Sequence, residues 1–450
     1  MDFSLTDHQL LIRDTVRQFM DAEVRPHVKE WEKTDFFPLE AIQKMGILGC
    51  CGMLTPEEWG GPGLDHISYV LMVEEVAKVH TAMSTALSVT NSAVQPPLLA
   101  FGTEAQKTQY LRRLASGEIL GAFCLTEPAA GSDAAGIQCT AIRAIVNSSP
   151  SRAVREMTPD CAPEVDSPPY LLNGTKTWVT NGSDAGVYIV FAKTQPELAG
   201  KGITAFLVEP TFPGFTIGRH EDKMGQRSSP SVELIFNDCI VPAANRLGEE
   251  GHGLKIALSA LDGGRIGIAA QAVGLAQGAL DESIKYARTR KAFGKPIAEQ
   301  QAIQWMLADM HTEIEAARGL LYQAAFLKDR AAEREHGADK DRAAGTGGRS
   351  FSSDINQTAK HRALALEELV SSGHGSRPTG HVLSASSRAK LYASEMVNRV
   401  VAKAVQIHGS QGYSRESEVE RMYRDARVLT IYEGTSEIQR TIIARDLLPR

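Results

Sequence analysis

The feature of this sequence that most constrains its fold is a double change of periodicity, from helical to short and β-branched and back to helical. Apolar residues recur at helical spacing through the first third of the chain. From about Gly121, short β-branched and aromatic runs are separated by Asn-Gly and Pro-Gly pairs, which is typical of strands joined by tight turns. From Gly251 onward, Ala- and Leu-rich segments return to helical spacing. This order predicts a helical, β, helical arrangement.

We predict three domains. An N-terminal helical domain covers residues 1–120, a middle antiparallel β domain covers 121–241, and a C-terminal helical domain covers 242–450. Two stretches break the pattern and are interpreted as insertions. The stretch 143–169 contains prolines among scattered charges, and the stretch 331–386 is rich in Gly, Ser, Ala and charged residues.

Capping signals locate two of the N-terminal helices. Thr6 with Gln9, and Thr103 with Gln106, form capping-box pairs ahead of apolar residues at helical spacing. The second of these helices is expected to stop at Gly117, because glycine commonly follows a helix end.

Composition excludes several classes of function. A net charge of -6 and a pI near 6.1 give no overall field that would attract nucleic acid. Six cysteines without a CxxC pair predict neither a disulfide framework nor a metal site. No apolar run approaches the roughly 20 residues that cross a bilayer, so no membrane association is expected. The N-terminus resembles no signal or transit peptide, which favours a cytoplasmic location, or the mitochondrial matrix if a transit peptide was removed.

The common enzyme templates are not matched. No GxGxxG follows an expected strand, and GxxxxGK[ST], HExxH and GxSxG do not occur. Five other blocks therefore carry the functional interpretation.

Two of these blocks flank strands of the middle domain. In FCLTEPAAGSD, Phe123–Asp133, small residues and hydroxyls leave backbone amides free to approach a polar heterocycle or a phosphate. A Pro-Gly turn between domains explains the same residues, and from the residues alone it is the better explanation. In WVTNG, Trp178–Gly182, an exposed indole beside a hydroxyl could cover a planar cofactor. A hairpin end with a core tryptophan explains this block equally well.

Two more blocks lie in the C-terminal third. In ALDGGRIGIAAQ, Asp262 and Arg265 are one turn apart at an expected helix start, and the guanidinium suits a phosphate or an adenine edge. The alternative is a surface Asp-Arg pair. In RKAFGKPI, Arg290 and Phe293 combine a cation with an aromatic face, and Gln301 follows. Taken alone, that block is a helix-terminating loop.

The last block, Gln406–Arg440, contains a candidate general base. Glu433 follows the apolar run Val428–Tyr432, and a carboxylate in an apolar setting has a raised pKa. The residues after it, ending at Glu437, precede a helix that Glu437 is expected to help cap. The alternative for Glu433 is a second capping carboxylate on a surface turn.

Together, the five blocks resemble the acyl-CoA dehydrogenase family in letters, order and spacing over nearly the whole chain outside the two insertions. The resemblance implies a fold of class α+β, with an N-terminal helical domain, a middle antiparallel β-barrel domain and a C-terminal four-helix bundle. It also implies bound FAD and a role in the β-oxidation of fatty acids.

The resemblance further implies which residues contact cofactor and substrate. The residues expected at FAD are Phe123, Leu125, Thr126, Ser132, Trp178, Val179, Thr180, Arg290, Phe293, Gln301, Gln406, Ile407, His408, Gly409, Thr435, Ser436 and Glu437. The residues expected at the acyl-CoA are Ser132, Asp262, Arg265 and Gly434. Of these, Arg290, Phe293 and Gln301 would reach FAD held by a neighbouring subunit, which implies a homotetramer.

The family places its base at one of two positions, which correspond here to Gly264 and Glu433. Glycine cannot abstract a proton, so the resemblance assigns the base to Glu433 and indicates a short-chain or short-branched-chain type. The implied reaction converts an acyl-CoA to a trans-2-enoyl-CoA. Glu433 takes the α-proton, flavin N5 takes the β-hydride, and electrons pass to an electron-transfer flavoprotein. The alternatives are an acyl-CoA oxidase and an inactive acyl-CoA-binding or assembly homologue.

Overall fold

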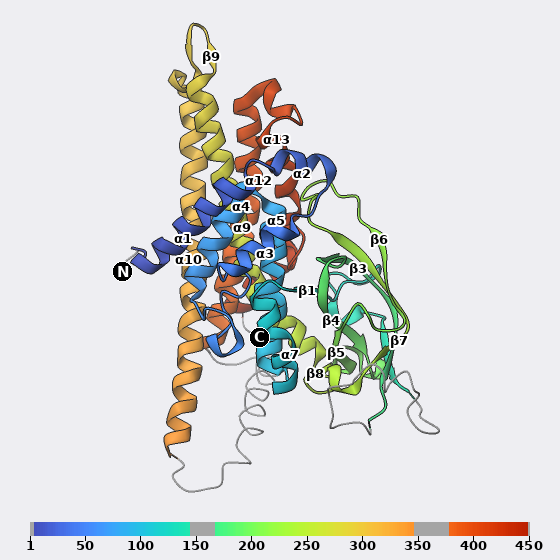
Figure 1. Ribbon diagram of the computed structural model, residues 1–450. Helices are drawn as coiled ribbons and strands as arrows, with labels where there is room; N and C mark the ends of the chain where they lie inside the picture. Colours follow the sequence, from blue (N-terminus) through green and yellow to red (C-terminus); the bar gives the residue numbers. More distant parts are fainter. Residues whose placement is uncertain (1–3, 145–166, 346–377, 449–450) are drawn as a thin grey trace.

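The N-terminal domain consists of helices that start at the expected capping residues. In the computed structural model, residues 4–144, 167–345 and 378–448 are described (Figure 1). Thr6 and Thr103 each accept a hydrogen bond from the backbone three residues on, and both capping boxes are complete. The helices are α1 (Asp7–Phe19), α2 (Val28–Thr34), α3 (Leu39–Ile47), α4 (His66–Val79), α5 (Thr81–Ser88), α6 (Gln95–Phe101) and α7 (Glu104–Ala115). Gly117 follows α7 with a φ of 74°, a left-handed conformation that suits glycine.

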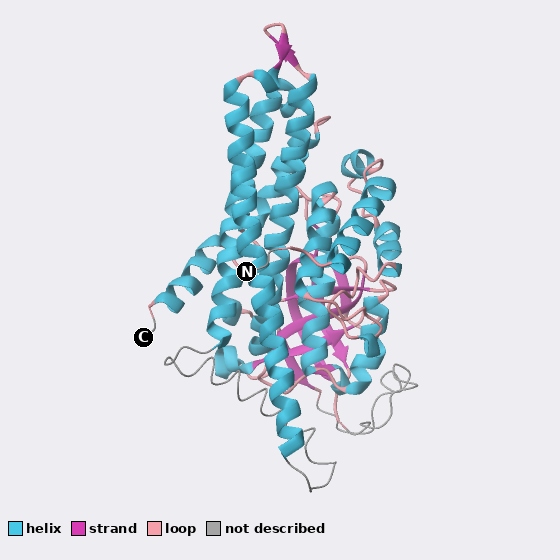
Figure 2. Ribbon diagram, turned by 90° about the vertical axis from the view of Figure 1, so that its left-hand side faces the viewer, coloured by secondary structure: helices cyan, strands magenta, loops and turns pink. Residues whose placement is uncertain are grey.

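The middle domain is a mostly antiparallel sheet that packs beside the helices (Figures 1 and 2). Its strands are β1 (Leu120–Cys124), β2 (Thr140–Arg143), β3 (Tyr170–Thr180), β4 (Ala185–Lys193), β5 (Ile203–Val208), β6 (Phe215–His220), β7 (Ser231–Val241) and β8 (Arg246–Leu247). The strand order is β6-β7-β3-β2-β4-β5-β8, with β1 beside β4. The antiparallel expectation fails for β1, which pairs with β4 in parallel, because a parallel neighbour can enter from a helix without a hairpin. Among the described strands, the path of hydrogen-bonded neighbours runs from β6 at one edge to β8 at the other.

Strand β4 is buried on both faces, which anchors the sheet to the helices. Tyr188 and Val190 belong to the interior of the sheet domain, whereas Ile189 and Phe191 pack in a cluster that includes Leu111 of α7. Because successive side chains of a strand point to opposite faces, one uninterrupted apolar run supplies both contacts.

The C-terminal domain is built on three long helices that pack pairwise, with a small hairpin at one end (Figure 2). Its elements are α9 (Gly253–Thr289), the hairpin strands β9 (Lys291–Ala292) and β10 (Lys295–Pro296), α10 (Gln301–Gly345), α12 (Pro378–His408), α13 (Glu418–Ala426) and α14 (Ser436–Leu447). Helix α4 of the N-terminal domain packs along α9 and α10 beside them. A Cβ on Gly274 of α9 would lie 2.8 Å from the backbone of Glu74, so glycine here allows α4 and α9 to approach closely.

The two expected insertions have different outcomes. Strand β2 ends at Arg143 and β3 begins at Tyr170, and the intervening residues 145–166 lie outside the described part of the chain. The second insertion was predicted too wide. Helix α10 continues from Ala331 to Gly345, and α12 already begins at Pro378. Ala, Glu, Lys and Arg dominate the end of α10, and these residues favour a helix even without an apolar stripe.

Candidate active site

Glu433 lies in a short turn between the 3-10 turn Arg427–Thr430 and α14. Its φ of 53° is left-handed, which is uncommon for a residue other than glycine, and Gly434 follows with a φ of 86°. Thr435, not Glu433, caps α14, because its hydroxyl accepts from the N–H of Ile438. The surface-cap alternative for Glu433 is therefore wrong.

The Glu433 carboxylate faces Gly264 of α9. A Cβ built on Gly264 would lie 2.8 Å from Cδ of Glu433 and closer still to Oε2, inside the 3.0 Å that real Cβ atoms keep. Oε2 is buried, and among the described residues nothing donates a hydrogen bond to it. The carboxylate thus occupies the space that a side chain at position 264 would otherwise fill.

Burial and two cations set the proton affinity of Glu433. Burial raises the pKa of Glu433 to about 7, while the nearby charges of Arg265 and Lys390 act to lower it. Arg265 is 5% exposed, and its Nε and Nη1 have no hydrogen-bond partner in the described part of the chain. The site therefore pairs a carboxylate that titrates near neutral pH with an arginine whose donors are available to a ligand.

Asp262 holds Arg265 from within the helical bundle. Its carboxylate accepts from Nζ of Lys328 at 2.6 Å and from the hydroxyl of Ser386 at 2.8 Å, and it lies 3.5 Å from Nη1 of Arg265. Burial acts to raise the pKa of Asp262, but Lys328 and Arg265 lower it below its usual value. The expected helix start at this block is wrong, because α9 begins at Gly253 and continues through both residues. The surface-pair alternative is also wrong, since Asp262 and Arg265 are largely enclosed.

The two middle-domain blocks are neighbours in space. The N–H of Thr177 donates to the carbonyl of Thr126 at 3.0 Å, and Nζ of Lys176 donates to the carbonyl of Leu125 at 3.1 Å. Trp178 follows at a break in the β3–β7 register, with a φ of 59° and 57% of its surface exposed. The core-tryptophan alternative is therefore wrong.

Helix α5 joins these blocks to the Glu433 turn. Nδ2 of Asn181 donates to the carbonyl of Ala86 at 3.1 Å. One residue earlier, Thr85 hydrogen-bonds to Gln271 of α9, whose Oε1 accepts from the hydroxyl of Tyr432. Elements of all three expected domains thus meet around one turn of α5.

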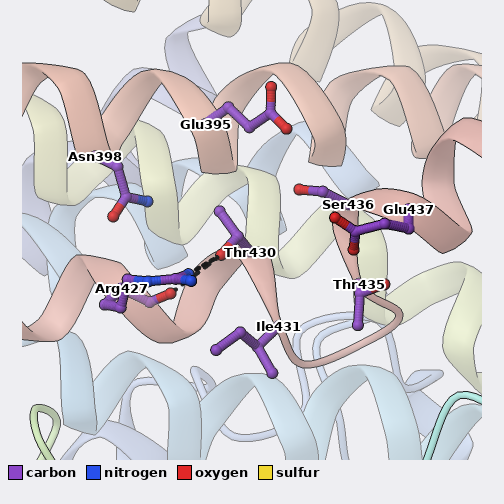
Figure 3. Close-up of a pocket in the computed structure, with 8 residues that line it drawn as sticks. All are labelled: Glu395, Asn398, Arg427, Thr430, Ile431, Thr435, Ser436 and Glu437. Atoms are coloured by element: carbon purple, nitrogen blue, oxygen red, sulfur yellow. Dashed lines mark hydrogen bonds between the residues drawn. The ribbon is translucent and has the colours of Figure 1, made fainter.

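These surfaces fit a large planar cofactor with polar substituents. Trp178 offers an exposed indole face, and the buried hydroxyl of Thr177 beside it has no described partner. A cavity of about 410 Å³ lies at the N-terminus of α14 (Figure 3). It is lined by Glu395, Asn398, Arg427, Thr430, Ile431, Thr435, Ser436 and Glu437. The hydroxyl of Ser436 is likewise buried without a described partner.

Comparison with known proteins decides the family. The chain matches the family models named acyl-CoA dehydrogenase N-terminal domain over residues 6–118, middle domain over 122–239, and C-terminal domain over 251–366 and 356–448. The chain belongs to the acyl-CoA dehydrogenase family. It is accordingly an oxidoreductase of a flavoprotein family.

Individual relatives span almost the whole chain. An acryloyl-CoA reductase (NADH) of Anaerotignum propionicum is 41% identical, over 100% of this chain and 97% of the relative. A mitochondrial short-chain specific acyl-CoA dehydrogenase of Rattus norvegicus is 40% identical, over 98% and 90%. Among solved structures, the butyryl-CoA dehydrogenase of Megasphaera elsdenii has a TM-score of 0.82 at 39% identity, over 99% of this chain and 100% of that one. An acyl-CoA dehydrogenase from Bacillus anthracis, complexed with FAD, has a TM-score of 0.79 at 32% identity, over 98% and 66%.

In this member of the acyl-CoA dehydrogenase family, a second group of expected cofactor residues lies away from Glu433. Phe293 lies in the turn of the β9–β10 hairpin, and Arg290 and Gln301 flank the hairpin, at the far end of the long helices (Figure 1). Along α9 this end is about 39 Å from Gly264, at 1.5 Å per residue. Phe293 is 95% exposed.

The segment 406–409 belongs to the same end of the molecule. The ring of His408 stacks on Tyr286 of α9 with centroids 4.3 Å apart, and Ile407 is buried. Because these two side chains are held inside the bundle, any contact that they make with FAD would be limited, whereas Gln406 and Gly409 are exposed.

Metal chemistry has no support in the described residues. They contain no cluster of three or more potential metal ligands, and their five cysteines are all free and buried. No helix among them is long and apolar enough to cross a membrane.

Sequence reasoning missed the buried polar residues that support the site. Lys390 donates to the carbonyl of Gly434, and the partly buried Lys328 donates to Asp262. Gln271 accepts from the hydroxyl of Tyr432, the residue before Glu433. A weak signal for Lys390 exists, because its helical neighbours Ser386, Ala393 and Ser394 are small, as residues on a closely packed helix face often are. Assigning the segment up to residue 386 to an insertion concealed that helical register.

Proposed function

We propose that this chain dehydrogenates a short or short-branched acyl-CoA to the trans-2-enoyl-CoA, with Glu433 as the base that removes the α-proton. The observation that carries this proposal is the buried, unpartnered Oε2 of Glu433 facing Gly264. A carboxylate whose pKa is about 7 is matched to accepting a proton near neutral pH. A structural carboxylate buried at this depth is expected to have hydrogen-bond donors.

The residues around the base would bind the substrate and stabilise the enolate. Nε and Nη1 of Arg265 have no hydrogen-bond partner among the described residues and would bind a polar part of the acyl-CoA, while Asp262, 3.5 Å from Nη1, fixes the guanidinium by its charge. The N–H of Glu433 would donate to the thioester carbonyl and stabilise the enolate that forms when the α-proton leaves. Tyr69 of α4, Arg265 of α9 and Lys390 of α12 lie around the buried carboxylate, and a bound substrate would complete the exclusion of water and strengthen these interactions.

FAD is the proposed cofactor and, when bound, would accept the hydride from the β-carbon. Phe123, Leu125, Thr126, Ser132, Trp178, Val179 and Thr180 would hold it from the middle domain, and Thr435, Ser436 and Glu437 from the start of α14. Arg290, Phe293, Gln301, Gln406 and Gly409 would reach the cofactor of a neighbouring subunit. Their distance from Glu433 within one chain supports this assignment and an oligomer such as a homotetramer.

The names of relatives support the substrate class and the electron acceptor. The rat relative is short-chain specific, and the Megasphaera structure is a butyryl-CoA dehydrogenase. A chain from a structure entitled electron transferring flavoprotein of Acidaminococcus fermentans is 39% identical over 100% of both chains. An electron-transfer flavoprotein is therefore the proposed acceptor, and a cytoplasmic or mitochondrial-matrix location stays a prediction.

The reverse reaction is the second candidate. The relative from Anaerotignum propionicum is named an acryloyl-CoA reductase, and it is as similar to this chain as the dehydrogenases are. In that direction, protonated Glu433 would return a proton to the α-carbon. A pKa near 7 leaves both protonation states populated at neutral pH, so Glu433 suits either direction.

A single-turnover assay tests the proposal. The purified protein is mixed without oxygen with acyl-CoAs of graded length, and the flavin absorbance is followed. We expect short chains to bleach the flavin fastest, and Glu433→Gln to retain flavin and bind acyl-CoA while bleaching orders of magnitude more slowly. Near-normal bleaching by this variant would refute the role of Glu433. Peroxide formation in air would indicate an oxidase, a faster reaction with an enoyl-CoA and an electron donor a reductase, and a purified protein without flavin an inactive homologue.

A further inference from the structure

Lys390 is a fully buried lysine that none of the proposed steps uses. It lies on α12 and is 0% exposed, and its Nζ donates to the carbonyl of Gly434 at 2.7 Å. Burying an ammonium group costs free energy of folding unless the group is paired. A buried lysine at this position is therefore a candidate for a functional role.

The carbonyl that Lys390 binds belongs to the left-handed turn that carries Glu433. The two consecutive positive φ angles at Glu433 and Gly434 are unfavourable without outside support. Gln439 of α14 provides part of this support, because its Nε2 donates to the carbonyls of Glu433 at 3.2 Å and Gly434 at 2.9 Å. Lys390 provides the rest from α12, so the turn is clamped from two helices.

We propose that Lys390 is a positioning residue for the base: it holds the Gly434 carbonyl and places a positive charge beside the turn that carries the Glu433 carboxylate. This inference rests on the proposed function of Glu433. It assigns to the reaction a residue that touches neither the substrate nor the cofactor.

The charges around the pair support the electrostatic part of the proposal. Glu433 faces Arg265 from α9 and the neutral hydroxyls of Tyr69 and Tyr432, whose pKa values are raised by burial. Lys390 is also within the field of Arg265, which acts to lower its pKa, and of Glu437 and Glu395, which act to raise it.

The pKa values of Lys390 and Glu433 both lie close to neutral pH. Burial lowers the pKa of Lys390 to about 8 and raises that of Glu433 to about 7. At pH 7, Lys390 is therefore mostly cationic while Glu433 is only partly ionised. Burial raises the pKa of Glu433, and the charge of Lys390 acts against this effect. Without that charge, the pKa of Glu433 should rise further, and a smaller fraction of Glu433 should be ionised and able to act as a base.

The test compares charge-removing and charge-keeping variants. The rate of flavin bleaching by butyryl-CoA is measured across pH for the wild type, Lys390→Met and Lys390→Arg. Lys403→Met is the matched control, since Lys403 lies on the same helix but pairs with Glu313 at the surface. We expect the midpoint of the rising limb to move up by about one pH unit in Lys390→Met, the lower end of the range for one nearby charge. The rate should recover at high pH, and the other two variants should keep the wild-type midpoint.

A purely structural lysine would behave differently. The rate of Lys390→Met would then fall by the same factor at every pH with an unmoved midpoint, and that outcome overturns the proposal. Lys390→Gln, which keeps a polar group in the buried position, replaces the Met variant if that variant fails to fold.

A second measurement does not depend on turnover. Thermal unfolding at neutral pH is compared for Lys390→Met, Glu433→Gln and the double variant. We expect Lys390→Met to lower Tm more in the wild-type background than in the Glu433→Gln background, because the charge pair exists only in the former. Equal shifts overturn the proposal. If no acyl-CoA bleaches the wild-type flavin, the proposed function fails while this cycle still reports whether Lys390 acts on Glu433.

Discussion

At the residue scale, Gly264 matters through the side chain that it lacks. Any Cβ at this position would overlap the Glu433 carboxylate. We predict that Gly264→Ala displaces the base and lowers the rate of flavin bleaching by about 100-fold, the size of effect that a misplacement of about 1 Å produces. Stopped-flow absorbance at saturating acyl-CoA measures this rate.

The adjacent glycine provides the control for this prediction. A Cβ on Gly263 would meet only ordinary contacts, the nearest being the carbonyl of Ser92 at 3.4 Å. Gly263→Ala should keep the rate and stabilise α9 by up to about 1 kcal/mol, because alanine favours a helix over glycine. Equal losses of rate in both variants would contradict the inference that the Glu433 carboxylate needs the space beside Gly264.

The raised pKa of Glu433 also has a cost in stability. The folded protein binds a proton at Glu433 up to about pH 7, whereas an unfolded glutamate releases it near pH 4.5. The free energy of unfolding should therefore fall as pH rises through this window. We predict that Glu433→Gln is more stable than the wild type at pH 8, by on the order of 2 kcal/mol, and equally stable near pH 4. Denaturant unfolding at both pH values measures the difference, and a constant difference would contradict it.

At the element scale, the sequence predicted helix boundaries well where a local capping or glycine signal marks them. The capping boxes at Thr6 and Thr103 are local signals, and both form as expected. The end of α10 and the start of α12 carry no such signal. Their charged or small residues are compatible with a loop as well as with a helix. The parallel pairing of β1 with β4 was also invisible, because a strand's partner is chosen by tertiary packing and not by its own periodicity.

The same limit applies to the candidate site. Glu433, Arg265 and Trp178 lie in blocks that could be recognised from the sequence. The residues that hold them, such as Lys390 and Gln271, contact them from other helices and become visible only when the helices are packed. The sequence therefore predicts the residues proposed to react or bind ligands, but not the residues on other helices that hold them in position.

A buried ion pair fixes the block at Leu125 to strand β3. Nζ of Lys176 lies 2.7 Å from Oε1 of Glu127, and both side chains are almost completely enclosed. We predict that Lys176→Met destabilises the protein by about 3–5 kcal/mol, because it leaves the Glu127 carboxylate buried and unpaired. Adding Glu127→Gln should restore much of this loss, which thermal unfolding of the three variants would show. An additive loss in the double variant would contradict the pairing.

At the scale of the whole molecule, a polar cluster joins all three domains. Arg421 of α13 pairs with Asp425 at 3.2 Å, and Asp425 accepts from the backbone of Gln226 in the middle domain. Glu32 of α2 belongs to the same cluster, and burial raises its pKa to about 7. The cluster lies one hydrogen bond from Tyr432, since Nε2 of Gln226 donates to that hydroxyl at 3.4 Å. Domain packing and the position of the Glu433 turn are thus connected.

Removing the central cation tests this connection. Arg421→Met should destabilise the protein by about 3–5 kcal/mol, because the fully buried Asp425 carboxylate then loses its ion-pair partner. Arg399→Met is the control, since the pair of Arg399 with Glu313 is more exposed and is expected to contribute at most about 1 kcal/mol. Similar shifts in Tm for both variants would contradict the importance of the buried cluster.

The β9–β10 hairpin carries the aromatic residue proposed to reach a neighbouring subunit. Phe293 at its tip is 95% exposed with a φ of 52°, so the turn holds a large aromatic ring in water. If the tip contacts the cofactor of a neighbouring subunit, Phe293→Ser should lower the flavin-to-protein ratio while the Tm of the flavin-free protein stays unchanged. Leu11→Ser, at another exposed apolar residue on α1, is the control and should keep its flavin. Absorbance and light scattering measure flavin content and assembly, and full flavin retention by Phe293→Ser would show that the hairpin does not serve the cofactor site.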